Sequence, residues 1–346
     1  MATVFLLIAI GLLVWAFANV LLVIFAGGLF AAFLTGLSGS VQRHLGLGEK
    51  TSYAVVVATV AAILGFGGYF LGSELATQFD ALGPRMHQAW EKMLDEVYRY
   101  EWGRIVFSET NLRALLPEDN KWVERVTGAF SMTIGAIAGL LIAIFIGLYG
   151  AATPHVYRRG FLLLLPPEER PRTGAVLNAI GTTMRWWLIG TFARMSVVGL
   201  LVTFGLWLMD IPLALALGLI AFVLDFVPYF GPVLAFLPAL LVGMTGGTSE
   251  VFSVLLLYLA VQSAENYVVT PLIDQYSVSL PPALTISAQV LLGAMLGALG
   301  VIFATPLTAI ALVMVQTLRA DEETLPAIAT RPIPPLPDKN RPPAPT

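Results

Sequence analysis

Seven long stretches of this chain carry almost no charge, and each is long enough to cross a lipid bilayer. They cover residues 4–38, 51–73, 126–150, 187–209, 212–245, 251–272 and 281–318. A helix needs about 20 mainly apolar residues to cross about 30 Å of hydrocarbon. Charged residues make up only 12% of the sequence, about half the fraction typical of soluble domains. The sequence therefore predicts an all-α polytopic membrane protein and excludes a soluble enzyme.

Several of these runs are too long for one simple crossing. The first run can form two short spans, at about 4–18 and 20–38, and the runs 212–245 and 281–318 are interrupted by Gly and Pro. We therefore expect about eight membrane-embedded helices, including two interrupted, hairpin-like segments. No Lys or Arg precedes Arg43, which disfavours a cleaved signal peptide with a basic first region.

Charge divides the connecting segments between the two faces of the membrane. The segment 151–186 holds five Arg against two Glu, whereas 74–125 has more acidic than basic residues. The positive-inside rule places the first in the cytoplasm and favours the opposite face for the second. The expected organisation is N-terminal spans in 1–73, an extracytoplasmic helical insertion at 74–125, a motif-bearing membrane region at 126–320 with the cytoplasmic amphipathic segment 151–186, and a disordered Pro-rich tail at 321–346.

Two segments outside the runs have an apolar helical face. In the insertion, the helical spacing joins Met86, Trp90, Met93, Leu94 and Val97. This pattern is typical of a helical cap that packs on the membrane domain or on itself, and the alternative is a ligand-capture or subunit-contact element. The stretch 172–187 is similar and predicts an interfacial helix that leads into a span.

Three charged residues lie inside the apolar runs: Arg194, Asp225 and Glu265. A charge at the centre of a bilayer costs about 2.5–3.5 kcal/mol, so such residues face a partner or a wet cavity and are functional candidates. The alternatives are an ion pair that only orients helices and, for Arg194, a shallow position from which the side chain reaches the interface.

Asp225 begins the most informative stretch of the sequence. Pro228 and Pro232 stand four residues apart, with Tyr229 and Gly231 between them. Such a stretch cannot continue as a straight helix, and broken backbone is tolerated in hydrocarbon only where protein buries it or it lines a water-filled cavity. The stretch predicts a hairpin or broken span with its tip at 228–232; a simple proline kink is the alternative.

A polar stripe follows in the next run. Gln262, Glu265 and Asn266 share one helix face, and the cost of exposing them to lipid predicts that they point inward. Pro271 is expected to end or bend this helix. The alternative is a hydrogen-bond ladder between helices.

The last run is interrupted by glycine and proline. Gly293 and Gly297 form a small-xxx-small pattern that lets helices approach closely, and Gly300 and Pro306 follow. These four residues are the candidate hinge or hairpin positions. In secondary transporters, a pair of interrupted segments points to the substrate site.

Several classes of chemistry are disfavoured. The chain has no Cys, and its three His lie outside the apolar runs, so no disulfide, metal site or buried His-based triad is expected, and no cofactor is implied. An aspartyl protease needs two facing Asp residues, and Asp225 is the only one in the runs. No phosphate-binding glycine loop of the P-loop type is present. A net charge of −3 disfavours a nucleic-acid partner.

The combined pattern resembles the autoinducer-2 exporter-like family of bacterial permeases. The resemblance rests on the stretch from Asp225 to Pro232, on Gln262-x-x-Glu265-Asn266 with Pro271, and on the glycine-rich run that ends in Ala304-Thr305-Pro306. The chain departs from the family pattern at Thr191, where glutamine is common, and at Asp274-Gln275.

The resemblance implies a transporter of a small molecule or a monovalent cation. With Asp225 and Glu265 as proton or cation sites, the first hypothesis is a secondary transporter that works as an exporter and couples transport to protons. The resemblance also implies a homo-oligomer, a pentamer, in the bacterial inner membrane with the C-terminal tail in the cytoplasm. The candidate transport site comprises Arg194, Asp225, Pro228, Tyr229, Gly231, Pro232, Gln262, Glu265, Asn266 and Pro271. A passive channel or a non-transporting membrane scaffold is the alternative function.

Overall fold

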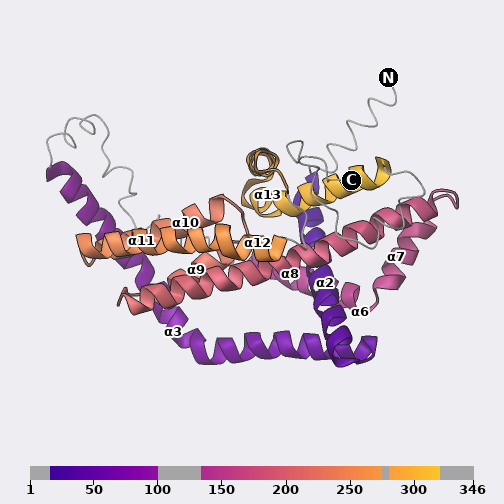
Figure 1. Cartoon of the computed structure of the whole chain (residues 1–346), viewed down its shortest axis with the longest axis horizontal. Coiled ribbons are helices and arrows are strands. Elements are labelled where there is room, and N and C mark those ends of the chain that lie inside the picture. The colour runs from indigo at the N-terminus through magenta and orange to yellow at the C-terminus, as the bar shows by residue number, and fades with distance from the viewer. Residues whose placement is uncertain (1–15, 100–133, 275–279, 320–346) are drawn as a thin grey trace, which may run out of the picture. The chain divides into compact units, whose positions relative to one another are not determined.

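The computed structural model describes residues 16–99, 134–274 and 280–319, and all regular structure in these ranges is helical. The helices are α2 (Ala18–Leu45), α3 (Glu49–Arg99), α6 (Ile134–Ala152), α7 (Pro154–Leu163), α8 (Arg170–Leu208), α9 (Ala214–Leu224), α10 (Phe230–Met244), α11 (Thr248–Ala264), the π-helical turn Glu265–Val269, α12 (Thr270–Asp274) and α13 (Pro282–Arg319) (Figure 1).

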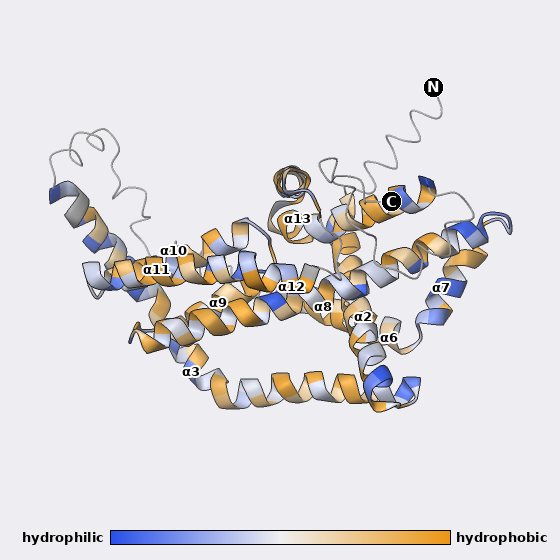
Figure 2. Cartoon of the chain, in the orientation of Figure 1, coloured by the Kyte–Doolittle hydropathy of each residue, from blue (hydrophilic) through white to orange (hydrophobic). Residues whose placement is uncertain are grey.

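The described helices fit a protein that crosses the membrane several times. Five of them are long and apolar enough to span it, and the number rises to six if the pair α6–α7, bent by 90°, counts as one span. Figure 2 shows that α9, α10 and α11 are mostly apolar, while polar residues alternate with apolar ones along α7. The prediction of an all-helical, multi-span membrane protein is confirmed for the described part of the chain.

The chain divides into two compact units. The terminal unit contains residues 1–56, 142–191 and 272–346, and the central unit contains 57–141 and 192–271. Helices α3 and α8 each contribute to both units.

The hydrophobic core of the central unit joins five helices. Its fully buried members include Val202 and Leu206 of α8, Leu217 of α9, Val242 of α10 and Val254 of α11. The second half of α3 also contributes to this core (Leu82 and Met86). Of the apolar face predicted in the insertion, Met86 belongs to this core.

Helix α3 passes from the second predicted span into the predicted insertion without a break, as far as Arg99. Residues 100–125 of the insertion, the predicted tail at 321–346 and the first predicted short span, at about 4–18, lie wholly or mostly outside the described residues.

The stretch 172–187, predicted as an interfacial helix, forms the first half of the continuous helix α8. Its apolar face is buried at Val176, Met184 and Trp187. This helix enters the span with no break at the predicted boundary.

Helix α13 of the terminal unit is interrupted near its middle. Gly297 adopts φ 67° and ψ −148°, a combination that essentially only glycine tolerates. The chain reverses there, so that an added Cβ on Gly293 would meet the Val301 side chain and one on Gly300 would meet the Leu292 carbonyl. The small residues allow this close approach. Pro306 lies beyond the reversal and is buried.

Candidate functional site

The three charged residues of the apolar runs come together in the central unit. Arg194 of α8 lies between two carboxylates: its Nε is 3.3 Å from Asp225 Oδ2 and 3.5 Å from Glu265 Oε1. The guanidinium also donates through Nη2 to the backbone carbonyl of Asp225, at 3.4 Å. We call these three residues the charged cluster. The ion pair considered from the sequence is present, and it involves both acids.

The charged cluster is removed from solvent. The side chains of Asp225 and Glu265 are 3% and 10% exposed, and that of Arg194 is 17% exposed. Asp225 is also the C-cap of α9, where the partial negative charge of the helix end favours a nearby cation. Arg194 thus provides a positive charge to both carboxylates and to the C-terminal end of α9.

The cluster carries an unbalanced charge when all three groups are ionised. Two carboxylates and one guanidinium sum to −1, and a buried charge without compensation is costly. One proton or one monovalent cation would balance it. Among the described residues no group of three or more His, Asp or Glu side chains could hold a metal ion.

Glu265 stands where helix α11 changes its geometry. The π-helical turn begins at this residue, and the Thr270 amide donates to the Glu265 carbonyl. Pro271 explains the change, because proline has no N–H to donate and its ring crowds the carbonyl four residues earlier. The helix widens before Pro271 and continues to Asp274. Wide turns of this kind occur frequently at functional sites.

The predicted polar stripe is only partly assembled. Gln262 Nε2 donates to Glu265 Oε2 at 2.9 Å, which fixes the second oxygen of this carboxylate. Asn266 is exposed, so the prediction that all three polar side chains point inward is wrong for Asn266. The π-helical turn begins at Glu265, so the regular α-helical spacing behind that prediction does not hold from this residue to Asn266.

The turn between α9 and α10 carries local backbone strain. Phe230 donates its amide to the Pro228 carbonyl at 2.8 Å, and Tyr229 between them has φ 67° and ψ −51°. This is a three-residue γ-turn with positive φ, which is rare and strained for a residue with a side chain. Pro232 then lies in the first turn of α10, where the missing N–H of proline costs nothing.

Gly231 is required by the same turn. A Cβ at this position would collide with the carbonyl oxygen of Leu224, the last residue of α9. Because that atom belongs to the backbone, no side-chain rotation relieves the collision. The two short helices pack on each other, so the predicted broken span is a helical hairpin, with Asp225 at its tip.

The strain at Tyr229 has a measurable consequence. We expect Tyr229→Gly to be more stable than Tyr229→Ala, with a free energy of unfolding about 1–2 kcal/mol higher. Glycine adopts positive φ without the penalty that a Cβ imposes. Denaturant unfolding of the purified variants in detergent measures this difference. The control is the same pair at Leu237, an exposed position of α10, where Ala should be more stable than Gly by about 1 kcal/mol. Equal or opposite behaviour at Tyr229 would rule out the strained turn.

Helix α3 secures the open end of the hairpin, and nothing in the sequence pointed to this. Gln78 Oε1 accepts the Ala216 amide at 2.9 Å, at the start of α9. Lys92 Nζ donates to the Thr245 carbonyl at 2.7 Å, at the end of α10. The Ala216 amide and the Thr245 carbonyl lie at helix ends, where backbone groups have no partner within the helix. Since the partners are 138 and 153 residues apart in the chain, no local pattern predicts them.

Gly293, Gly297, Gly300 and Pro306 belong to the terminal unit, and the charged cluster belongs to the central unit. The two predicted groups of site residues thus belong to different units. The model of one known family, described as AI-2E family transporter, matches residues 4–320.

The chain belongs to the AI-2E transporter family. It is also similar to two curated proteins of Bacillus subtilis named "Putative transport protein YrrI" and "Putative transport protein YueF". The identities are 29% over 206 residues and 23% over 191 residues, covering 56% and 54% of this chain. A "Putative transport protein" of Thermotoga maritima is 33% identical over 110 residues, which is 32% of this chain and 34% of that protein.

The match spans 58% of YrrI and 52% of YueF, so it spans about half the length of these curated relatives. The AI-2E family match confirms the resemblance noted in the sequence, and together with the candidate spans it indicates a multi-pass membrane protein of a bacterial transporter family. Membership of a transporter family accords with the prediction that the chain is not an enzyme.

Proposed function

We propose that this chain is a secondary transporter, working as an exporter of a small molecule or a monovalent cation, in which the charged cluster binds the coupling proton or cation. The observation that carries the proposal is one guanidinium, mostly shielded from solvent, that is shared by two buried carboxylates. The cluster lacks one positive charge. A site of this charge can release its cation to one side of the membrane and take up another from the opposite side.

Helix lengths support a site deep in the membrane. With 11 and 15 residues, α9 and α10 are about 17 and 23 Å long, at 1.5 Å per residue. Neither crosses about 30 Å of hydrocarbon. If the end of the hairpin held by α3 lies at one membrane surface, Asp225 lies about 17 Å away from it, near the midplane. Secondary transporters hold substrates and coupling ions at this depth, at broken helices.

The broken segments also bear on the number of embedded helices. The five to six spans include α13 as one helix, although it reverses at Gly297. Counting its two arms and the two arms of the α9–α10 hairpin separately gives eight or nine membrane-embedded helices. The charges of the connecting segments support an extracytoplasmic insertion at 74–125 and a cytoplasmic segment at 151–186. The same orientation places the C-terminal tail in the cytoplasm of a cell whose inner membrane holds the protein.

Exposed apolar surface supports assembly with lipid and with further copies of the chain. In the most apolar 18-residue stretch of α3, only 6% of the residues are buried within the chain. The side chains of Ile63, Leu64 and Phe66 are each more than 60% exposed. A homo-oligomer, with five copies as the resemblance implies, would cover part of this surface. Light scattering of the protein in detergent measures the number of copies.

A substrate screen in proteoliposomes tests the transport function. Vesicles with an imposed pH gradient are offered monovalent cations and small polar solutes, and uptake or release is measured against protein-free vesicles. We expect saturable flux that follows the pH gradient and shows counterflow, in which an unlabelled solute on one side drives a labelled solute across from the other.

The outcome separates the competing functions. Saturation and counterflow are the behaviour of a carrier. Flux that does not saturate would replace the proposal with a passive channel. Absence of flux for every solute, in vesicles that contain folded protein, would favour a scaffold.

A further inference from the structure

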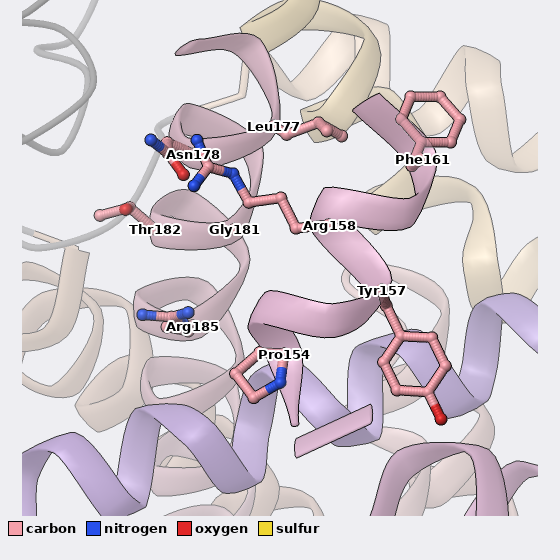
Figure 3. Close-up of a pocket in the computed structure, with 9 residues that line it drawn as sticks. All are labelled: Pro154, Tyr157, Arg158, Phe161, Leu177, Asn178, Gly181, Thr182 and Arg185. Atoms are coloured by element: carbon pink, nitrogen blue, oxygen red, sulfur yellow. The ribbon is translucent and has the colours of Figure 1, made fainter. Parts of the chain in front are cut away.

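The terminal unit contains a basic pocket that has no role in the proposed transport site. It has a volume of about 490 Å³ and lies between α7 and α8 (Figure 3). Both helices line it with residues at helical spacing. Those of α7 are Pro154, Tyr157, Arg158 and Phe161, and those of α8 are Leu177, Asn178, Gly181, Thr182 and Arg185. Pockets of this volume hold small molecules or headgroups.

The pocket is positively charged. Arg158 and Arg185 are the only charged residues that line it in the described part of the chain. Within the described ranges, no carboxylate lies within 4.0 Å of either guanidinium. Arg158 donates one long hydrogen bond of 3.5 Å to the Gly174 carbonyl. The two guanidinium groups therefore retain most of their donors for a ligand.

The other polar groups of the pocket suit a phosphate. Figure 3 shows Arg158 reaching from α7 toward α8, with its guanidinium beside Asn178, and Arg185 lying further along α8 on the side that carries Thr182. Arginine binds phosphate through paired N–H donors in a planar fork. Amide and hydroxyl side chains add neutral donors at the same wall.

The position of α7 favours a lipid as the carrier of that phosphate. Helix α7 leaves the apolar helix α6 at an angle of 90°, as expected for a helix that turns from a span into the plane of the interface. Its apolar side chains are open, with Val156, Tyr157 and Phe161 between 50% and 65% exposed. A membrane would cover this surface, and the pocket would then lie at headgroup level.

We propose that the α7–α8 pocket binds the phosphate headgroup of an anionic phospholipid. The segment 151–186 holds five Arg and two Glu, which the positive-inside rule assigns to the cytoplasmic face. Basic pockets between membrane helices on this face bind anionic headgroups. Bound lipid would tie α7 to the first half of α8, which is part of the terminal unit.

Native mass spectrometry of the full chain in detergent tests the pocket. The protein is titrated separately with short-chain phosphatidylglycerol, short-chain phosphatidylcholine and inorganic phosphate. We expect selective binding of phosphatidylglycerol. Each arginine that donates directly to the phosphate contributes roughly tenfold in affinity, so Arg158→Gln with Arg185→Gln should weaken binding by roughly 100-fold.

Two further variants make the test specific. Arg159→Gln removes the same charge from the neighbouring residue, which does not line the pocket, and should leave binding within about twofold. Gly181→Leu keeps both arginines and fills the cavity, since nothing lies within 4 Å of an added Cβ there. We expect this variant to lose selective binding. It tests the pocket independently, in case the double arginine variant does not fold.

Three results would overturn the proposal. Equal weakening by Arg159→Gln would mean that general surface charge attracts the lipid. Inorganic phosphate binding as tightly as phosphatidylglycerol would mean that the pocket serves a soluble anion. Undiminished binding in Gly181→Leu would place the lipid elsewhere.

Discussion

Replacing Glu265 by Gln is expected to abolish flux driven by a pH gradient while leaving the protein folded. The substitution keeps the size of the side chain and its partner Gln262, but it removes one of the two negative charges beside Arg194. The remaining Asp225–Arg194 pair is neutral, so the cluster no longer needs a proton or cation to balance its charge. Uptake in proteoliposomes should fall to the level of protein-free vesicles.

The matched control lies on the same helix. Glu250→Gln makes the same chemical change in the first turn of α11, outside the charged cluster, and should retain flux. Gel filtration and unfolding in detergent establish that both variants are folded. Gradient-driven flux of normal size in Glu265→Gln would remove this residue from the coupling step.

Replacing Arg194 by Gln is expected to have the largest effect on stability. It leaves Asp225 and Glu265 without their shared cation, and breaking a buried ion pair by removing one partner costs about 3–5 kcal/mol. Arg194 is only 17% exposed, so solvent compensates little of this loss. The free energy of unfolding in detergent should fall by about that amount.

Restoring neutrality should recover most of the stability. The triple variant Arg194→Gln, Asp225→Asn and Glu265→Gln has no charge left to bury, and its free energy of unfolding should exceed that of Arg194→Gln alone. Such non-additive behaviour is typical of residues in one network. A triple variant less stable than the single one would mean that the arginine stabilises the fold through packing and not through charge.

The local elements of the site could be predicted from the sequence, because their signals are local. Proline restricts its own backbone, and glycine adopts conformations that other residues avoid, so both act within a few residues. Pro228, Gly231 and Gly297 therefore mark real interruptions. Ionised groups in an apolar run need partners, which singled out Arg194 and both acids.

Contacts between distant segments could not be predicted in the same way. No periodic pattern joins Gln78 to Ala216 or Lys92 to Thr245, because each pair forms only after the helices pack. The face of α11 was misjudged at Asn266, since the sequence does not announce the π-helical turn that begins beside it. The sequence likewise shows Arg158 and Arg185 only as part of a basic segment, because the pocket depends on the 90° turn between α6 and α7.

Proton movement itself is the most direct test of the charged cluster. Proteoliposomes that contain a pH-sensitive dye are exposed to a gradient of the transported solute, with wild-type protein and with Asp225→Asn and Glu265→Gln combined. We expect the wild type to move protons against the solute and the double variant to move none. Equal proton movement in the two would contradict the assignment of the coupling site to Asp225, Arg194 and Glu265.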